Sequence, residues 1–358
     1  MSPEYMTPRE RLACVFAGKT PDRVPYYEQF WVSTRKRWLR EGMPLNVSAE
    51  EYFDIELVRI GGDHSMQFPH RLVEETEHQR TYWDENGALR RDLLTTDNEW
   101  TPQWLDFTIK TPDDWRKHRE RMAMNATRIP PTVMDAYAHA RKKNRFVVFT
   151  GQGSLTPTWA KLGFQNTLLL MLDQPEFVNE LFASHVEITI ALFEALLDMG
   201  MTFDGAWLSD DLGYNKGPMI SPALYRELLL PHHKRLCDLF ASHGLKTILH
   251  SDGDVRPLIP DFLDAGFGAL HPLEVKAGID VRDLKQTYGN RLISFGNIDV
   301  RKLSGTREEI EQEIAAKVPV AMAGGGYVFN SDHSVPNTVS LESYRFALQM
   351  LRKYGTYE

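Results

Sequence analysis

The chain has 358 residues, which is enough for one large domain or two ordinary ones. Hydrophobic residues make up 42% of it and charged residues 25%, as is typical of a globular protein with a sizeable core. A net charge of -8 and an isoelectric point near 5.9 argue against binding to nucleic acid or to an anionic membrane surface.

No basic segment followed by an apolar one opens the chain, and no apolar run reaches membrane-spanning length. We therefore expect a cytoplasmic protein that binds no membrane. Cys14 and Cys237 are far apart in the sequence and lie in helical patterns, so the sequence predicts neither a disulfide framework nor a thiolate zinc site.

The N-terminal part combines helical signals with one hairpin. Thr7-Pro8-Arg9-Glu10 is a capping box with proline at the first helical position, and the helix that it opens is expected to end at Gly18. Residues 24–31 are aromatic and prone to form β-structure, and they are the candidate for the first barrel strand. Residues 80–91 predict a hairpin around Asn86-Gly87, which must be an insertion because it is antiparallel.

Strands and helices alternate regularly from residue 146 onward. The expected strands are 146–150, 205–209, 245–249, 267–270, 292–296 and 326–330, and the expected helices are 175–199, 222–243, 256–265, 281–288, one beginning at 307, and 341–353. Such alternation permits either a closed barrel or an open doubly wound sheet. Gly151-Gln152-Gly153 lacks the third glycine of a dinucleotide-binding fingerprint, and the other strands also end in polar residues, which favours the barrel.

The sequence thus predicts an α/β protein, a (β/α)8 TIM barrel with an N-terminal helical extension and a β-hairpin insertion. We expect a single domain over residues 1–358, with the extension, the first strands and the hairpin in 1–140 and the regular barrel portion in 141–358.

Polar residues follow five of the apolar runs at the point where each run ends. These endings are Asp210-Asp211, His250-Ser251-Asp252-Gly253-Asp254, His271-Pro272-Leu273-Glu274, Asn297-Ile298-Asp299 and Ser331-Asp332-His333. Active sites of TIM barrels lie at the carboxyl ends of the strands, so we expect these side chains to converge on one cavity. The candidate catalytic residues are Asp210, Asp211, Glu274, Asn297 and Asp332.

Two histidines and one carboxylate in this set could hold a metal ion. His250, Asp252 and His333 together would suit zinc with an open position, or ferrous iron, and Glu274 is a competing carboxylate ligand. Without a metal, His250 and Asp252 could instead act as an acid/base pair.

Several of these residues also have ordinary structural interpretations. Trp159 and Trp207 could wall a substrate pocket or could simply belong to the core. Asp299 could bind substrate or cap a helix, and Asp254 is expected to be a cap. His232-His233 is expected to be a partly exposed pair on a helix rather than a ligand set.

A series of motifs along the chain resembles the uroporphyrinogen decarboxylase superfamily. They are Pro21-Asp22-Arg23-Val24-Pro25, Gly217-Pro218-Met219-Ile220-Ser221-Pro222, Leu230-Pro231, His250-Ser251-Asp252-Gly253, Gly296-Asn297-Ile298-Asp299 and Gly326-Tyr327-Val328-Phe329-Asn330, in the order of the family. The resemblance covers nearly the whole chain and implies a (β/α)8 barrel with an N-terminal extension.

The resemblance also distinguishes between the two branches of the superfamily. True decarboxylases carry an N-terminal Arg-Gln-Ala-Gly-Arg segment, where this chain has Glu28-Gln29-Phe30-Trp31-Val32 without an arginine. The family's tyrosine and serine are matched by Trp159 and by Asp210 or Asp211, and only His333 matches a decarboxylase site position. The coenzyme M methyltransferases of the other branch bind zinc through His-x-Cys and a later Cys, where this chain has His250-x-Asp252 and His333.

The expected function is therefore that of a methyltransferase related to O-demethylases. It would move a methyl group from a small methylated substrate, expected to be methoxylated, to a separate corrinoid protein, with zinc assistance. The chain has no cobalamin-binding Asp-x-His-x-x-Gly, so a partner would carry the corrinoid. The alternative is a lyase of the uroporphyrinogen decarboxylase type that acts on a carboxylated substrate without metal, and a homodimer is left open as the assembly.

Overall fold

The structure, a computed structural model, describes residues 5–94 and 102–357. Its centre is a parallel sheet of seven strands in the order β1-β6-β7-β10-β11-β12-β13. The strands are β1 (Leu57–Gly61), β6 (Phe146–Gln152), β7 (Gly205–Ser209), β10 (Thr247–His250), β11 (Phe267–His271), β12 (Ile293–Phe295) and β13 (Tyr327–Val328). The buried residues of β6, β7 and β10 form nearly continuous apolar runs, because a parallel sheet with helices on its outer face leaves neither face in water.

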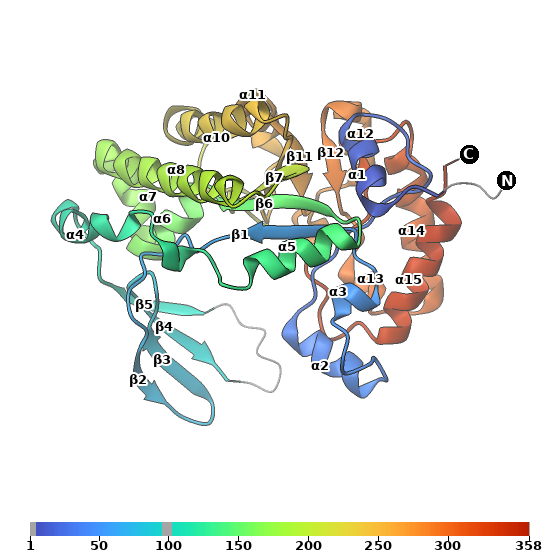
Figure 1. Ribbon diagram of the computed structural model, residues 1–358, viewed down its shortest axis with the longest axis horizontal. Helices are drawn as coiled ribbons and strands as arrows, with labels where there is room; N and C mark the ends of the chain where they lie inside the picture. The colour runs from blue at the N-terminus through green and yellow to red at the C-terminus, as the bar shows by residue number, and fades with distance from the viewer. Residues whose placement is uncertain (1–4, 95–101, 358) are drawn as a thin grey trace.

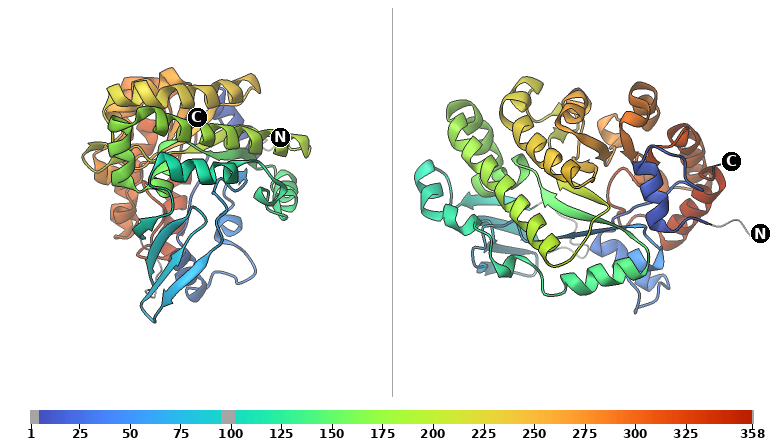
Figure 2. Two further views of the ribbon diagram at one scale, coloured as in Figure 1. Left: turned by 90° about the vertical axis from the view of Figure 1, so that its left-hand side faces the viewer. Right: turned by 45° about the horizontal axis from the view of Figure 1, so that its top comes forward.

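Helices surround the curled sheet, as Figure 1 and Figure 2 show. They are α1 (Pro8–Phe16), α2 (Val32–Arg40), α3 (Ala49–Tyr52), α4 (Pro112–His118), α5 (Val133–Lys142), α6 (Leu155–Leu162), α7 (Phe164–Asp173), α8 (Pro175–Asp198), α9 (Pro222–Leu224), α10 (Leu230–Ser242), α11 (Ile259–Ala265), α12 (Val281–Tyr288), α13 (Val300–Leu303), α14 (Arg307–Met322) and α15 (Leu341–Tyr354). The expected capping boxes are present at Thr7 and at Thr306, where α1 and α14 begin.

The expected closed barrel of eight strands is not formed among the described residues. Residues 24–31 are not a strand, and Tyr26 makes only an isolated parallel bridge to Phe329. The Tyr27 N–H donates to the Phe329 carbonyl at 3.0 Å, and the Glu56 N–H donates to the Tyr26 carbonyl at 3.4 Å. Pro25 has no N–H to contribute to a ladder, which explains why this segment lies between β13 and β1 without forming a regular strand. The fold is therefore a curled, TIM-like seven-stranded sheet.

The hairpin expected around Asn86-Gly87 is part of a larger antiparallel sheet, which lies to one side of the helices and the parallel sheet (Figure 1). Its four strands are β2 (Arg71–Glu75), β3 (Gln79–Trp83), β4 (Ala88–Leu93) and β5 (Gln103–Phe107). The turn between β3 and β4 is held by Asp84 Oδ1, which accepts the N–H groups of Asn86 and Ala88 at 2.9 Å each. A two-stranded ribbon, β8 (Gly213–Tyr214) and β9 (Gly217–Pro218), follows β7.

The helix expected over residues 222–243 is interrupted. A π-helical turn at Tyr225–Leu229 separates α9 from α10. Pro231, which follows this turn, has no N–H for the regular helical bond, and this favours the wider turn. The expectation for the histidine pair is wrong for His233, which is fully buried and contacts the Tyr225 hydroxyl through Nδ1 at 2.9 Å.

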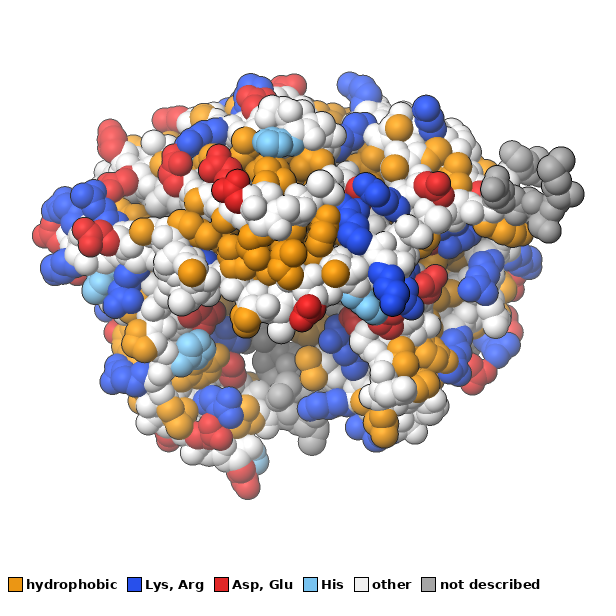
Figure 3. All heavy atoms as spheres, in the orientation of Figure 1, with side chains coloured by type: hydrophobic (Ala, Val, Ile, Leu, Met, Phe, Trp, Pro, Cys, Tyr) orange, Lys and Arg blue, Asp and Glu red, His pale blue; other side chains and the backbone are white. Residues whose placement is uncertain are grey.

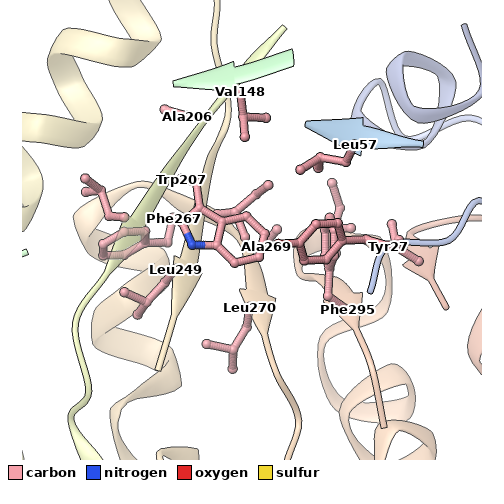
Figure 4. Packing of buried hydrophobic residues seen from close by; sticks show 14 of the residues in the cluster. Tyr27, Leu57, Val148, Ala206, Trp207, Leu249, Phe267, Ala269, Leu270 and Phe295 are labelled. Atoms are coloured by element: carbon pink, nitrogen blue, oxygen red, sulfur yellow. The ribbon is translucent and has the colours of Figure 1, made fainter. Parts of the chain in front are cut away.

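Trp207 fills the interior of the sheet rather than walling a pocket. Its side chain is fully buried, and its ring centroid lies 4.6 Å from that of His271 and 5.2 Å from that of Tyr27. Figure 4 shows the indole among Tyr27, Leu249 and Phe295. Trp207 therefore forms an apolar floor beneath the ends of the central strands.

The face in Figure 3 carries Lys and Arg side chains interspersed with Asp and Glu. No helix of the described residues is long and apolar enough to cross a lipid bilayer.

Candidate active site

Five polar side chains meet at the carboxyl ends of the central strands and form two overlapping groups. Asp211, His250 and Asp252 form one group, and Asp252, Glu274 and His333 form the other, with the ligand atoms of each group within 4.8 Å of one another. Asp211 follows β7, Asp252 follows β10, Glu274 follows β11 and His333 follows β13, while His250 ends β10. The structure thus places all three predicted metal ligands here, but it divides His250 and His333 between two groups that share Asp252.

Asp252 is the common member of the two groups. Its Oδ1 is buried without a hydrogen-bond partner among the described residues. Burial raises the pKa of this carboxyl, an effect that His333 and Lys276 only partly offset. An orphaned carboxylate oxygen between two imidazoles has the donor chemistry that a divalent cation requires.

Asp211 lies on the His250 side of Asp252. Its Oδ1 accepts the N–H of Asp252 at 3.2 Å and lies 3.8 Å from His250 Nε2. Burial and the neighbouring Asp252 raise its pKa, while His250 lowers it in part. Among the described residues, no lysine or arginine forms an ion pair with this half-buried carboxylate.

His250 is held by His271, which sequence analysis had not selected as a site residue. The two Nδ1 atoms lie 2.8 Å apart, and burial lowers the pKa of His250 to about 4 and that of His271 well below its ordinary value. Between two neutral imidazoles one Nδ1 must donate to the other. When His250 is the donor, the lone pair of its Nε2 faces Asp211 and is free to bind a cation.

Glu274 and His333 complete the other side. The Glu274 side chain is buried, with Oε2 accepting the Gly253 N–H at 3.1 Å and Oε1 lying 3.1 Å from Lys276 Nζ. The His333 ring stacks on Trp31 with centroids 6.0 Å apart. Both side chains are therefore oriented before any ligand binds.

The carboxylate of Asp210, adjacent to Asp211, is surrounded by backbone N–H groups and a buried histidine. It is fully buried, and its two oxygens accept the N–H groups of Ser154, Leu155 and Thr156 at the start of α6, at 2.9, 3.1 and 2.7 Å. His233 Nε2 lies 2.9 Å from Oδ2. Gly153 is required beside it, because a Cβ at that position would lie 2.4 Å from the Asp210 carboxylate.

Three further candidates also bind backbone groups. Asn297, at φ 122°, donates to the carbonyls of Leu273 and Ile279 and accepts from Val281. Asp332 accepts the N–H groups of Val275 and Val300 at 3.0 and 2.9 Å. Asp299 caps α13 through the Arg301 N–H, as the capping interpretation predicts. These residues shape the loops that carry the ligand groups.

Trp159 lines an apolar cavity of about 840 Å³ between α6, α7 and the antiparallel sheet. Other lining residues are Trp104, Phe107, Phe164, Leu169 and Met219. Asp211, His250, Asp252, Glu274 and His333 are not among its lining residues. Two hydrogen bonds link the elements around the cavity to the segment that carries Asp211: Thr156 Oγ1 of α6 accepts the Asp211 N–H at 2.7 Å, and the Met219 N–H donates to the Leu212 carbonyl at 2.7 Å.

Arg59 and Glu28 are further charged residues near the site that sequence analysis had not selected. The Arg59 guanidinium lies 4.6 Å above the Trp207 ring and donates to Thr150 Oγ1 at 3.0 Å. Glu28 is buried and accepts hydrogen bonds from Ser331 Oγ at 2.7 Å and Asn330 Nδ2 at 2.8 Å. His271 could have been found from its position at a strand end, whereas Arg59 lies within a strand that the sequence does not mark.

The chain is similar in sequence to known proteins. The sequence model of the family "Uroporphyrinogen decarboxylase (URO-D)" matches residues 97–354. Uroporphyrinogen decarboxylases of Pelobacter propionicus and Nocardia farcinica are 24% and 28% identical to the chain, over 49% of its length in each case and over 52% and 48% of theirs. The chain thus spans about half the length of these curated relatives.

A solved structure supports the fold over the whole chain. A methyltransferase from Methanosarcina mazei superposes with a TM-score of 0.69 and covers 98% of this chain and 99% of its own. Because the two sequences are only 17% identical, this similarity supports the fold and leaves the reaction open.

Proposed function

Since the chain belongs to the uroporphyrinogen decarboxylase family, we propose that within this fold it is a methyltransferase. It moves a methyl group from a small methylated substrate, expected to be methoxylated, to a corrinoid on a separate protein, with zinc bound at Asp252. The observation that carries the proposal is the pair of ligand groups around Asp252, whose Oδ1 has no partner among the described residues.

The donor set fits a divalent cation. His250 is held neutral by burial, which lowers its pKa to about 4, and a neutral imidazole is the form that binds metal. His250 supplies an imidazole beside the carboxylates of Asp211 and Asp252, and His333 supplies one beside those of Asp252 and Glu274. A bound zinc ion supplies Lewis acidity, which stabilises the charge that develops when the basic heteroatom loses its methyl group.

Other side chains of the protein orient the metal ligand and the substrate. His271 orients His250 through the Nδ1 contact of 2.8 Å. Trp159 and Trp104, with ring centroids 5.1 Å apart, offer an apolar wall for the ring of a methoxylated substrate. The segment around Tyr26 bridges to Phe329 and accepts a hydrogen bond from the Glu56 N–H. We propose that this segment occupies the position of the eighth strand in a (β/α)8 barrel.

A lyase acting on a carboxylated substrate is the second candidate. Its support is that the curated relatives are uroporphyrinogen decarboxylases and that, by the resemblance of its motifs to that family, His333 falls at a decarboxylase site position. Against it, the segment in which decarboxylases carry two arginines has Glu28 here, buried and bonded to Ser331. Arginine is the side chain best suited to bind substrate carboxylates in pairs of hydrogen bonds.

The test compares zinc content and methyl transfer in the wild type, His250→Ala, His333→Ala and His78→Ala. His78 is an exposed histidine in the turn between β2 and β3 and serves as the matched control. Reduced corrinoid protein and a panel of methoxyarenes and methylamines are supplied, and methylation of the cobalt is followed by absorbance. We expect the first two variants to lose at least about 100-fold in rate, as loss of a metal ligand does, and the control to match the wild type. Formation of coproporphyrinogen from uroporphyrinogen, without methyl transfer, would establish the lyase instead.

A further inference from the structure

The two ligand groups at the strand ends are each complete without the other. One has Asp211, His250 and Asp252, and the other has Asp252, Glu274 and His333, so that each contains one imidazole, one carboxylate of its own and the shared Asp252. The first group comes from β7 and β10, and the other adds the loops after β11 and β13. The five side chains of the two groups are more than a single tetrahedral zinc ion binds.

The ligand atoms of each group lie close together. They are all within 4.8 Å of one another, and His250 Nε2 and Asp211 Oδ1 are 3.8 Å apart. Ligand atoms on one tetrahedral zinc ion, at about 2.0–2.2 Å from it, lie roughly 3.3–3.6 Å apart, so small shifts of these side chains would bring each group onto an ion. His250 and His333 do not share a group, so one ion held by both is not the arrangement that the side chains already have.

Asp252 is placed to serve both sides at once. A carboxylate has two oxygens and can give one to each of two cations. Its buried Oδ1 accepts no hydrogen bond from the described residues, so this oxygen is not committed elsewhere. Among the described residues, Asp252 is thus the ligand that an ion on either side would share.

An ion on one side alone would leave the other group incomplete. With the ion between Glu274 and His333, Asp211 would keep only the backbone N–H of Asp252 and the neutral His250, 3.8 Å away. With the ion between Asp211 and His250, the contacts of the His333 imidazole with described residues would be its stacking on Trp31 and its contact with the Ser334 carbonyl at 3.4 Å. Each group would therefore still have ligand atoms available for a cation if the other group held one.

We propose that these five residues hold two divalent metal ions bridged by the carboxylate of Asp252. Asp211 and His250 bind one ion, and Glu274 and His333 bind the other, so that each ion has three protein ligands and an open position. Lys276 moves off Glu274 when the second ion binds, which its half-exposed side chain allows. The inference rests on the metal of the proposed function and adds a second ion to it.

The experiment measures metal stoichiometry rather than activity. Protein stripped with a chelator is titrated with Zn²⁺, excess metal is removed, and the ratio of metal to protein is determined by elemental analysis. We expect two ions per chain in the wild type, one in Asp211→Asn, one in Glu274→Gln and fewer than one in Asp252→Asn. Asp264→Asn, which changes an exposed acid, is the control and should retain two. Far-UV circular dichroism establishes that each variant is folded.

A spectroscopic measurement keeps the proposal testable if Asp252→Asn does not fold. Wild-type protein loaded with Mn²⁺ should give the electron paramagnetic resonance signal of a coupled pair, because ions in such sites lie about 3.5–4 Å apart. Signals of isolated ions at full loading would overturn the bridge. A ratio of one in the wild type, with methyl transfer intact, would overturn this inference and leave the proposed function standing, whereas a ratio of zero in inactive protein would overturn both.

Discussion

Asp210 and Asp211 are adjacent acids with opposite environments. Successive side chains at the end of a strand point to opposite sides, so Asp210 is directed at the first turn of α6 while Asp211 faces His250 and Asp252. Burial by itself raises the pKa of Asp210, but the hydrogen bonds from His233 and the backbone more than offset this, and the net pKa is lowered. One acid thus stabilises the fold and its neighbour faces the ligand groups.

This difference predicts opposite outcomes for two isosteric changes. Asp210→Asn removes the charge that pairs with three backbone donors and His233, so we expect the free energy of unfolding at pH 7 to fall by about 2–4 kcal/mol. Asp211→Asn should change stability by less than about 1 kcal/mol. Because the folded pKa of Asp210 is lowered, its contribution is present above the unfolded pKa and is lost as the pH falls through the folded value. Urea unfolding of both variants at several pH values is the measurement, and equal losses in the two would contradict this assignment.

At the level of elements, α6 carries polar side chains into the interior. Ser154, Thr158 and Lys161 recur at intervals of four and three residues, so they share one buried face of the helix. Lys161 Nζ has one hydrogen bond, to the Pro157 carbonyl at 3.1 Å, and no ion pair among the described residues. Burial lowers its pKa to about 7, an effect that Arg128 reinforces and Asp84 opposes.

The lysine makes the stability of the protein depend on pH in the alkaline range. Its folded pKa lies below the unfolded value near 10.5, so the unfolded state binds more protons between these values. Stability from this group is full above the unfolded pKa and falls, by up to about 1.4 kcal/mol per pH unit, as the pH drops toward 7. Lys161→Met should raise the free energy of unfolding at pH 7 and flatten its dependence on pH between 7 and 10. Urea unfolding at each pH tests this, with the exposed Lys216→Met as control. A pH profile identical to that of the wild type would contradict it.

The elements that sequence predicted best are those with local signals. The capping boxes at Thr7 and Thr306 and the turn at Asn86-Gly87 are satisfied by residues within four positions, so a short window contains the whole cause. The burial of His233 depends on its contact with Asp210, which is 23 positions away. A short sequence window does not contain both His233 and Asp210.

The same limit applies to the site. The sequence showed that polar residues follow the strands, and from this it predicted that Asp211, His250, Asp252, Glu274 and His333 lie in one region, as they do. Which of two neighbouring acids faces the cavity was not visible, because that depends on the exact residue at which the strand ends. The sequence likewise could not assign His250 and His333 to separate groups, since this requires the curvature of the sheet.

At the scale of the molecule, a buried ion network joins the two outer strands of the sheet. Glu56, fully buried just before β1, accepts hydrogen bonds from Arg11 Nη1 at 2.9 Å and Arg23 Nη2 at 2.5 Å. Its own N–H bonds to Tyr26, which bridges to Phe329 beside β13. The side chain and the backbone of Glu56 therefore stabilise the seam between β13 and β1, which is the place where the sheet nearly closes.

Breaking this network should weaken the whole molecule rather than one loop. Glu56→Gln would leave the buried Arg11 with Asp22, at 2.7 Å, as its one acidic partner among the described residues, and we expect a loss of about 3–5 kcal/mol in the free energy of unfolding. Glu311→Gln, which breaks an exposed pair with Lys353, should leave stability unchanged. Hydrogen exchange provides the spatial readout, because the Tyr27 N–H that bonds to Phe329 should lose protection in Glu56→Gln before the amides of β6 and β7 do. Uniform loss of protection across the sheet would mean that Glu56 acts on overall stability alone and that the seam has no special weakness.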